Sequence, residues 1–158
     1  MTIIAAGTKV PDFVLHRADG SEFTEKDLQG TTTVLVFYPF AFSPVCTDQL
    51  QVYEEAVDEL REQGATLYGV STDPTYAQTA FQERLGVSIE QLSDFEPKGA
   101  TARKLGAYFE PGGMTNRALV IVGPDGTVAW SHLAGSPGDL PGVNLIFDGL
   151  AAVAGRAA

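Results

Sequence analysis

Cys46 is the only cysteine among the 158 residues of the chain. It follows an unbroken apolar run, residues 34–38, and precedes a segment in which apolar residues recur at steps of three and four from Leu50 to Leu60. The run is typical of a strand buried on both faces, and the periodic segment is typical of an amphipathic helix. A lone thiol has no internal partner for a disulfide. Any redox chemistry must therefore use this one sulfur and a molecule from outside.

The helix that carries Cys46 is predicted to begin at Ser43-Pro44. Serine is a favoured N-cap, and proline fits the first helical position, where its missing N–H costs nothing. Cys46 then becomes the third helical residue, among backbone N–H groups without intrahelical partners and at the positive end of the helix dipole. This placement favours the thiolate over the thiol. The alternative is a small inert core cysteine, which is common for a single cysteine but does not account for the cap.

Pro39, Ser43 and Cys46 have the spacing Pro-x-x-x-Ser/Thr-x-x-Cys. This pattern resembles the signature of the peroxiredoxins, which are thiol peroxidases of thioredoxin-like fold. Other segments fall in the family's order, and they are Gly7-x-x-x-Pro11-Asp12-Phe13, Asp19-Gly20, Val70-Ser71-Thr72-Asp73 and an arginine, Arg117, that opens a late strand. The resemblance covers nearly the whole chain, and with its length and apolar content it indicates one domain over residues 1–158.

The resemblance implies a catalytic role for four residues. Cys46 matches the peroxidatic cysteine, whose thiolate attacks the peroxide O–O bond and becomes a sulfenic acid. Ser43 matches the hydroxyl that hydrogen-bonds the peroxide, in place of the more usual threonine. Arg117 matches the arginine that faces the sulfur and stabilises negative charge, although a surface salt bridge is its alternative role. Pro39 matches the proline that shields the thiolate from water, but it could equally be a strand terminator.

Three more residues are candidates for substrate binding. Gln49 is a residue type that the family uses three positions after the cysteine. The alternative interpretation of Gln49 is an ordinary exposed helix residue. Phe40 and Phe42 make the approach to the sulfur apolar, which favours alkyl or lipid peroxides. Hydrogen peroxide and peroxynitrite stay open as substrates.

The sequence has no second cysteine, and this narrows the type of peroxiredoxin that the chain resembles. Two-cysteine peroxiredoxins resolve the sulfenic acid with a second thiol, so this chain resembles the one-cysteine type, and residues 40–42 resemble the bacterial alkyl hydroperoxide reductase E group. An external thiol must then act as reductant, either a low-molecular-weight thiol, a glutaredoxin-like protein or a thioredoxin-like protein. We expect no cofactor and no metal, because His16 and His132 are far apart and have no ligands at suitable spacing.

Composition and charge limit the partners. The formal net charge of −10 repels phosphate backbones, so nucleic acid is not an expected partner. No apolar run approaches the roughly 18 residues of a membrane span, and the N-terminus lacks a basic leader. A single reduced thiol fits the cytoplasm. We also expect a homodimer, with the Gly- and Pro-rich loop 108–115 contributing to its interface.

The order of elements predicts an α/β fold. After an N-terminal hairpin (13–17 and 22–24), we expect strands at 33–39, 66–71, 91–94, 118–122 and 127–132, and helices at 44–63, from Asp73-Pro74 to Gly86, at 98–106 and at 142–154. In Asp73-Pro74 the aspartate is predicted to be the N-cap and the proline the first helical residue, as in Ser43-Pro44. Gly123-Pro124-Asp125-Gly126 is a hairpin turn. This order suits a thioredoxin-like fold, a central mixed β-sheet flanked by helices with the N-terminal hairpin as an extension.

Two other classes of function remain open at this stage. The same fold could act as a peroxide-sensing regulatory module, in which oxidation of Cys46 alters binding to another protein. It could also be a structural thioredoxin-like binding domain, for which replacement of Cys46 would leave every activity intact. A disulfide oxidoreductase is disfavoured because the sequence has no C-x-x-C motif.

Overall fold

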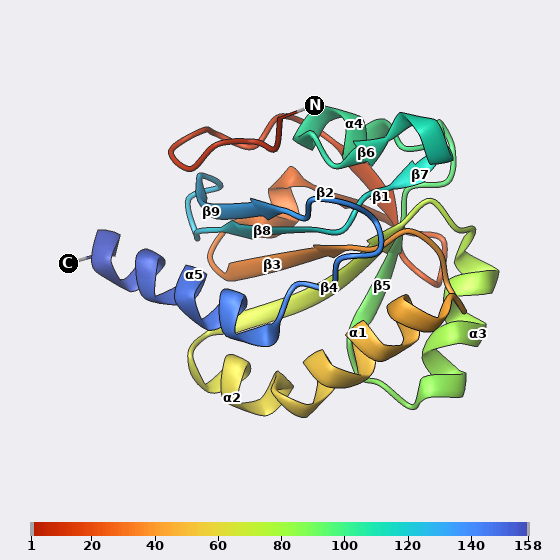
Figure 1. Ribbon diagram of the computed structural model, residues 1–158. Helices are drawn as coiled ribbons and strands as arrows, with labels where there is room; N and C mark the ends of the chain where they lie inside the picture. The colour runs from red at the N-terminus through yellow and green to blue at the C-terminus, as the bar shows by residue number, and fades with distance from the viewer. Residues whose placement is uncertain (1, 158) are drawn as a thin grey trace.

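The computed structural model describes residues 2–157, and within them seven strands form one mixed sheet (Figure 1). The strands are β1 (Val14–His16), β2 (Glu22–Thr24), β3 (Thr32–Phe37), β4 (Ala65–Ser71), β5 (Glu90–Ser93), β8 (Ala118–Val122) and β9 (Val128–Leu133). Their order across the sheet is β2-β1-β5-β4-β3-β8-β9. The three central strands β5, β4 and β3 are parallel, whereas the outer pairings are antiparallel.

Helices cover both faces of this sheet (Figure 1). They are α1 (Pro44–Glu55), α2 (Val57–Glu62), α3 (Thr75–Leu85), α4 (Ala100–Leu105) and α5 (Val143–Ala157), with 3-10 turns η1 (Glu25–Leu28) and η2 (Glu110–Gly112) and a small ladder of β6 (Tyr108–Phe109) with β7 (Met114–Thr115). No helix within residues 2–157 has both the length and the apolar composition to cross a bilayer.

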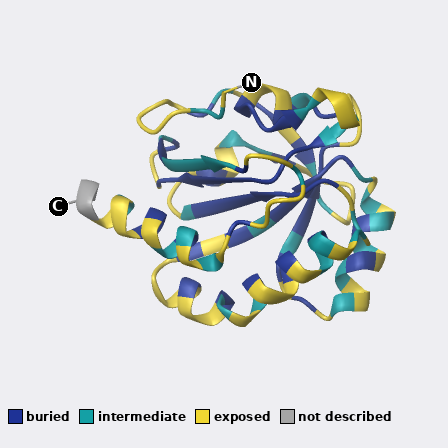
Figure 2. Ribbon diagram, viewed as in Figure 1, coloured by how far each residue is buried: buried dark blue, intermediate teal, exposed yellow. Residues whose placement is uncertain are grey.

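The apolar core is divided by the sheet into two clusters. Alternate residues of β3 point to opposite faces, so Leu35 and Phe37 join the cluster under α4 and the N-terminal hairpin, while Val34 and Val36 join the cluster under α1, α2, α3 and α5. The central strands β3 and β8 are almost wholly buried, and the outer faces of the helices are exposed (Figure 2). Cys46 belongs to the second cluster.

Most predicted elements are confirmed within one or two residues. The hairpin at the N-terminus pairs Leu15 with Phe23, and the turn after β8 closes with a hydrogen bond from Gly126 N–H to the Gly123 carbonyl. The mixed sheet with helices on both faces is also as predicted.

Two predicted helices differ from the structure. The single helix expected over 44–63 is interrupted at Ala56, because its N–H bonds to the Tyr53 carbonyl three residues back and the helical ladder tightens there. The predicted capping role of Asp73 is wrong. Pro74 occupies the N-cap position of α3 without a side-chain cap, and the Asp73 carboxylate bonds elsewhere.

Candidate active site

The segment between β3 and α1 places Cys46 at the start of a helix. Ser43 has extended backbone angles and is the N-cap, and its Oγ accepts a hydrogen bond from the Cys46 N–H at 3.3 Å. Pro44 occupies the first helical position, so Cys46 is the third residue of α1. The predicted cap and register are therefore confirmed. The cysteine lies where the first-turn N–H groups and the helix dipole favour negative charge.

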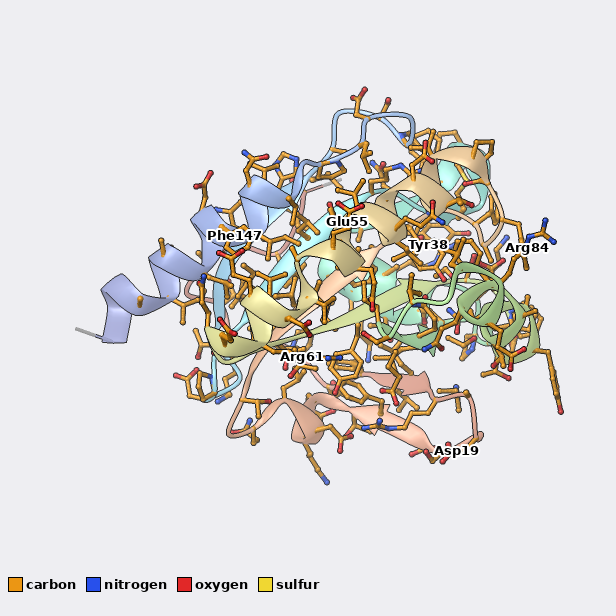
Figure 3. All side chains as sticks on the ribbon, turned by 90° about the horizontal axis from the view of Figure 1, so that it is seen from below. Asp19, Tyr38, Glu55, Arg61, Arg84 and Phe147 are labelled. Atoms are coloured by element: carbon orange, nitrogen blue, oxygen red, sulfur yellow. The ribbon has the colours of Figure 1, made fainter. Side chains whose placement is uncertain are left out.

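Cys46 is fully buried in this conformation. Tyr38 lies in the same apolar cluster, and its position between α1 and α3 can be followed in Figure 3. Pro39 is also buried, and Ser43 is half-buried. The enclosure limits access of water and of large molecules to the sulfur.

The loop before the cysteine carries two exposed aromatic side chains. Phe40 is 42% exposed and Phe42 is 49% exposed. The Phe42 ring contacts Phe81 of α3, with 5.2 Å between ring centroids. Phe42 also has a φ of 70°, a left-handed conformation that is unfavourable for a bulky side chain. An apolar rim therefore borders the start of α1, and its backbone is strained.

Arg117 lies immediately before β8 and is almost completely buried. Its Nη1 donates a hydrogen bond to Gln49 Oε1 at 2.8 Å, and its Nε donates to the Pro137 carbonyl at 2.6 Å. Among the hydrogen bonds of residues 2–157, the guanidinium makes none to Cys46 or Ser43. The structure thus brings Arg117 to the helix of Cys46, and the residue that it binds there is one turn further along.

The contact of Arg117 with Gln49 continues into α1. Gln49 Nε2 donates to the Tyr53 hydroxyl at 3.2 Å, and that hydroxyl donates to the Pro141 carbonyl at 2.6 Å. Burial raises the pKa of Tyr53 to about 12, against the opposing effects of its bond to Gln49 and of the Arg117 charge. Gln49 and Tyr53 are each fully buried. The chain from Arg117 to Pro141 is a buried polar network that fixes the guanidinium.

The site contains residues that the sequence analysis did not single out. Tyr53 was part of an apolar helical stripe, and its hydroxyl gave no signal of a partner. Pro137 and Pro141 contribute carbonyl oxygens, which no side-chain pattern can reveal. Thr115 donates a hydrogen bond to the Tyr38 carbonyl beside the loop of Pro39. From the sequence it was placed only at the end of the loop 108–115, two residues before Arg117.

The chain resembles known proteins over most of its length. A family model described as the AhpC/TSA family matches residues 6–131. Alkyl hydroperoxide reductase E of Mycobacterium tuberculosis is 27% identical over 152 residues, which cover 96% of this chain and 99% of that protein. Alkyl hydroperoxide reductase C of Amphibacillus xylanus is 34% identical over 112 residues, which cover 70% of this chain and 60% of that protein.

The fold also resembles that of a solved structure. The crystal structure of Enterococcus faecalis AhpC superposes with a TM-score of 0.86 at 28% identity, and the match covers 96% of this chain and 93% of that one. The predicted thioredoxin-like fold is thereby confirmed.

Proposed function

The chain belongs to the AhpC/TSA family and is an enzyme of the peroxiredoxin class, and from this premise we propose that it reduces hydroperoxides through Cys46 alone, with an external thiol as reductant. The observation that carries the proposal is the position of Cys46 as third residue of α1, with its N–H bonded to Ser43. Catalysis by one cysteine needs a sulfur that is ionised before the peroxide arrives, and a helix N-terminus favours ionisation.

The reaction has two stages. The Cys46 thiolate attacks one oxygen of ROOH, the O–O bond breaks, and the products are the sulfenic acid Cys–SOH and the alkoxide RO⁻, which takes a proton to become ROH. An external thiol R′SH then displaces water from the sulfenic acid and forms a mixed disulfide. A second R′SH attacks the mixed disulfide, releases R′S–SR′ and restores the Cys46 thiol. The sum is ROOH plus two R′SH giving ROH, water and R′S–SR′.

Ser43 and Arg117 are the groups proposed to stabilise the transition state. The Ser43 hydroxyl accepts the Cys46 N–H and still has its own proton to donate to a peroxide oxygen. The Arg117 guanidinium has five N–H donors, of which its bonds to Gln49 and Pro137 use two. Its remaining donors and its permanent charge can stabilise the negative charge on the leaving oxygen. Pro39, which is buried, limits water at the sulfur.

We propose a positioning role for Gln49 in place of the predicted contact with substrate. The side chain is fully buried, and both ends of its amide are occupied, the oxygen by Arg117 and the nitrogen by Tyr53. Phe40 and Phe42 remain candidates for substrate contact, since both rings are half exposed at the start of α1. Their apolar surface favours an alkyl hydroperoxide over hydrogen peroxide.

The physiological reductant and the assembly belong to the same proposal. A low-molecular-weight thiol suits a fully buried sulfur better than a glutaredoxin-like or thioredoxin-like protein, which would need a movement of the loop. We also propose a homodimer, because Phe40, Phe42, Tyr76 and Phe95 expose large apolar surfaces and loop 108–115 carries Phe109 and Met114. A cytoplasmic location is proposed from the single cysteine.

Sustained turnover is the test that separates the enzyme from a sensor. Reduced protein is mixed with an excess of alkyl hydroperoxide and a small dithiol, and peroxide loss is followed in time. We expect many equivalents to be consumed, and Cys46→Ser to consume none beyond the background. Consumption that stops after one equivalent with each of several thiol reductants would contradict the enzyme and favour the peroxide-sensing module.

A further inference from the structure

The Asp73 carboxylate reaches from the loop after β4 to the loop that precedes Cys46. Its Oδ2 accepts hydrogen bonds from the Ala41 backbone N–H at 2.8 Å and from the Ser71 hydroxyl at 2.7 Å. The two loops meet because β3 and β4 are parallel neighbours, so both chains leave the sheet at the same edge. Asp73, which its sequence position predicts to be a helix N-cap, therefore binds the segment that leads to Cys46.

The carboxylate is held by its own set of hydrogen bonds. Ser71 Oγ accepts bonds from Gln78 Nε2 at 2.9 Å and from the Asp73 N–H at 3.3 Å. Ser93 Oγ donates to the Asp73 carbonyl at 2.6 Å. Ser71, Gln78 and Ser93 are all buried. Asp73 is half-buried, and its buried hydrogen-bond partners allow it few other arrangements, so its Oδ2 is presented to Ala41 from a fixed position.

The segment that Asp73 binds needs such support. Phe42 follows Ala41 and has the left-handed φ of 70°, a conformation that persists only where the surroundings impose it. The Phe42 ring rests against Phe81, and the residue after it is the N-cap Ser43. The Ala41 N–H bond thus lies one residue from the strained position and two from the hydroxyl that bonds Cys46 N–H.

From these contacts we propose that Asp73 is a positioning residue for the thiol chemistry. It fixes Ala41, which fixes the turn at Phe42, and that turn sets where the Ser43 hydroxyl and the first turn of α1 lie relative to an incoming peroxide. None of the hydrogen bonds of Asp73 within residues 2–157 involves the Cys46 side chain. This role rests on the peroxidase function proposed above.

The test compares two rates at Cys46 in the full chain. One is its oxidation by an alkyl hydroperoxide, and the other is its alkylation by a bulky maleimide. Asp73→Ala should slow oxidation about tenfold or more, since a small misplacement of reacting groups can cost as much as about a hundredfold in rate. The same variant should speed alkylation, because the released loop no longer covers the sulfur. Because an unfolded chain would also expose the thiol and lose the folded site, both rates are compared under conditions in which urea unfolding shows the variant to be fully folded.

Asp73→Asn separates the hydrogen bond from the charge. Its amide oxygen can still accept the Ala41 N–H, so oxidation should stay within about threefold of the wild type, in line with the modest net value of one neutral hydrogen bond. Asp125→Ala is the matched control, because the Asp125 carboxylate likewise accepts a backbone N–H, that of Thr127, in a distant exposed hairpin. Its two rates should equal those of the wild type.

Ser71→Ala serves where Asp73→Ala does not fold, as judged by circular dichroism. It removes the hydroxyl that orients the carboxylate and should shift both rates in the same directions by a smaller factor. Unchanged rates in the folded variants, or an Asp73→Asn that is as slow as Asp73→Ala, would overturn the positioning role. A wild-type Cys46 that no peroxide oxidises would instead overturn the peroxidase function itself.

Discussion

The first turns of α1 and α4 satisfy their backbone N–H groups in different ways. At α4 the Asp94 carboxylate accepts the N–H groups of Thr101 at 3.1 Å and Ala102 at 2.8 Å. Asp94 is buried, and the loss of solvation raises the pKa of its carboxyl even though those two bonds oppose the rise. At α1 the corresponding acceptor is the neutral Ser43 hydroxyl, which takes only the Cys46 N–H.

Under the proposed function, this difference separates a helix end that serves stability, at α4, from one that serves reactivity, at α1. At α4 the Asp94 carboxylate supplies the negative charge that a helix N-terminus favours. The two N–H groups that it binds are therefore not free to bind a ligand. At α1 the cap is uncharged, so in the proposed reaction the negative charge comes from Cys46 or from the leaving oxygen. We therefore expect changes at α1 to alter the rate of oxidation, and changes at α4 to alter the free energy of unfolding.

Replacement of Arg117 should give the largest effect on rate. Arg117→Met removes the cation that binds Gln49 of α1, and we expect oxidation of Cys46 to slow by about 10²-fold, the lower end of the usual cost of losing one donor to a developing oxyanion. Arg117→Lys should retain part of the rate, since the charge stays but the planar fork is lost. The measurement is quenched-flow oxidation by an alkyl hydroperoxide.

Arg103 provides the matched control for that experiment. It lies in α4, stacks over the Tyr108 ring and pairs with Glu110, and its side chain is about half exposed. Arg103→Met should leave the oxidation rate within about twofold, because an exposed ion pair contributes little. Equal losses in the Arg103 and Arg117 variants would contradict a specific role for Arg117.

Replacement of Asp94 should act on stability alone. Asp94→Ala leaves the N–H groups of Thr101 and Ala102 without their acceptor, and we expect the free energy of unfolding to fall by about 2–3 kcal/mol. Urea unfolding measures this loss. The oxidation rate of the folded variant should stay unchanged. A slow but fully stable variant would abolish the distinction between the two helix ends.

Replacement of Ser43 should lower both the free energy of unfolding and the rate of Cys46 oxidation, each by a smaller amount. Ser43→Ala removes the cap and should lower the free energy of unfolding by about 1 kcal/mol. It should also slow oxidation by up to roughly tenfold, since one hydrogen bond contributes about 0.5–1.5 kcal/mol and about 1.4 kcal/mol corresponds to tenfold in rate. Ser43→Thr keeps the hydroxyl and should retain the wild-type rate. A Ser43→Ala variant that loses stability but reacts at full rate would show that the hydroxyl acts only as a cap.

Tyr53 predicts a dependence of stability on alkaline pH. Burial raises its folded-state pKa from 10.0 to about 12, so the neutral hydroxyl is favoured in the folded state. The resulting stabilisation is complete below pH 10.0 and is lost as the pH rises to about 12, where the unfolded chain ionises first. The free energy of unfolding should therefore fall more steeply in this range for the wild type than for Tyr53→Phe. If chemical unfolding gave the same dependence of the free energy of unfolding on pH for both proteins, the buried network would be contradicted.

The fold could be predicted because its signals are local. The apolar run of β3, the Ser43-Pro44 start of α1 and the hairpin turn before Gly126 each depend on a few adjacent residues. The break at Ala56 could not be predicted, because it comes from one backbone hydrogen bond inside an otherwise regular apolar stripe.

From local geometry, only the parts of the site that are adjacent in the chain were predictable, and Arg117 was named through the family resemblance alone. Ser43 and Cys46 are linked by helix geometry, so their spacing was informative. The bonds of Asp73 to Ala41 and of Tyr53 to Pro141 join segments 32 and 88 residues apart. They depend on which strands are neighbours and on the path of a loop, and backbone N–H and carbonyl groups have no sequence signature. A residue type alone therefore gave the wrong role for Asp73.

The most direct test of the account is the first oxidation of Cys46. Reduced protein is mixed with hydrogen peroxide, an alkyl hydroperoxide and peroxynitrite in turn, quenched at short times, and analysed by mass spectrometry for sulfenic acid at this residue. We predict formation of one sulfenic acid per chain at least about a hundredfold faster than oxidation of free cysteine at the same pH, as an electrostatically prepared site requires. Oxidation at the rate of free cysteine with all three peroxides would contradict an activated thiolate at the start of α1.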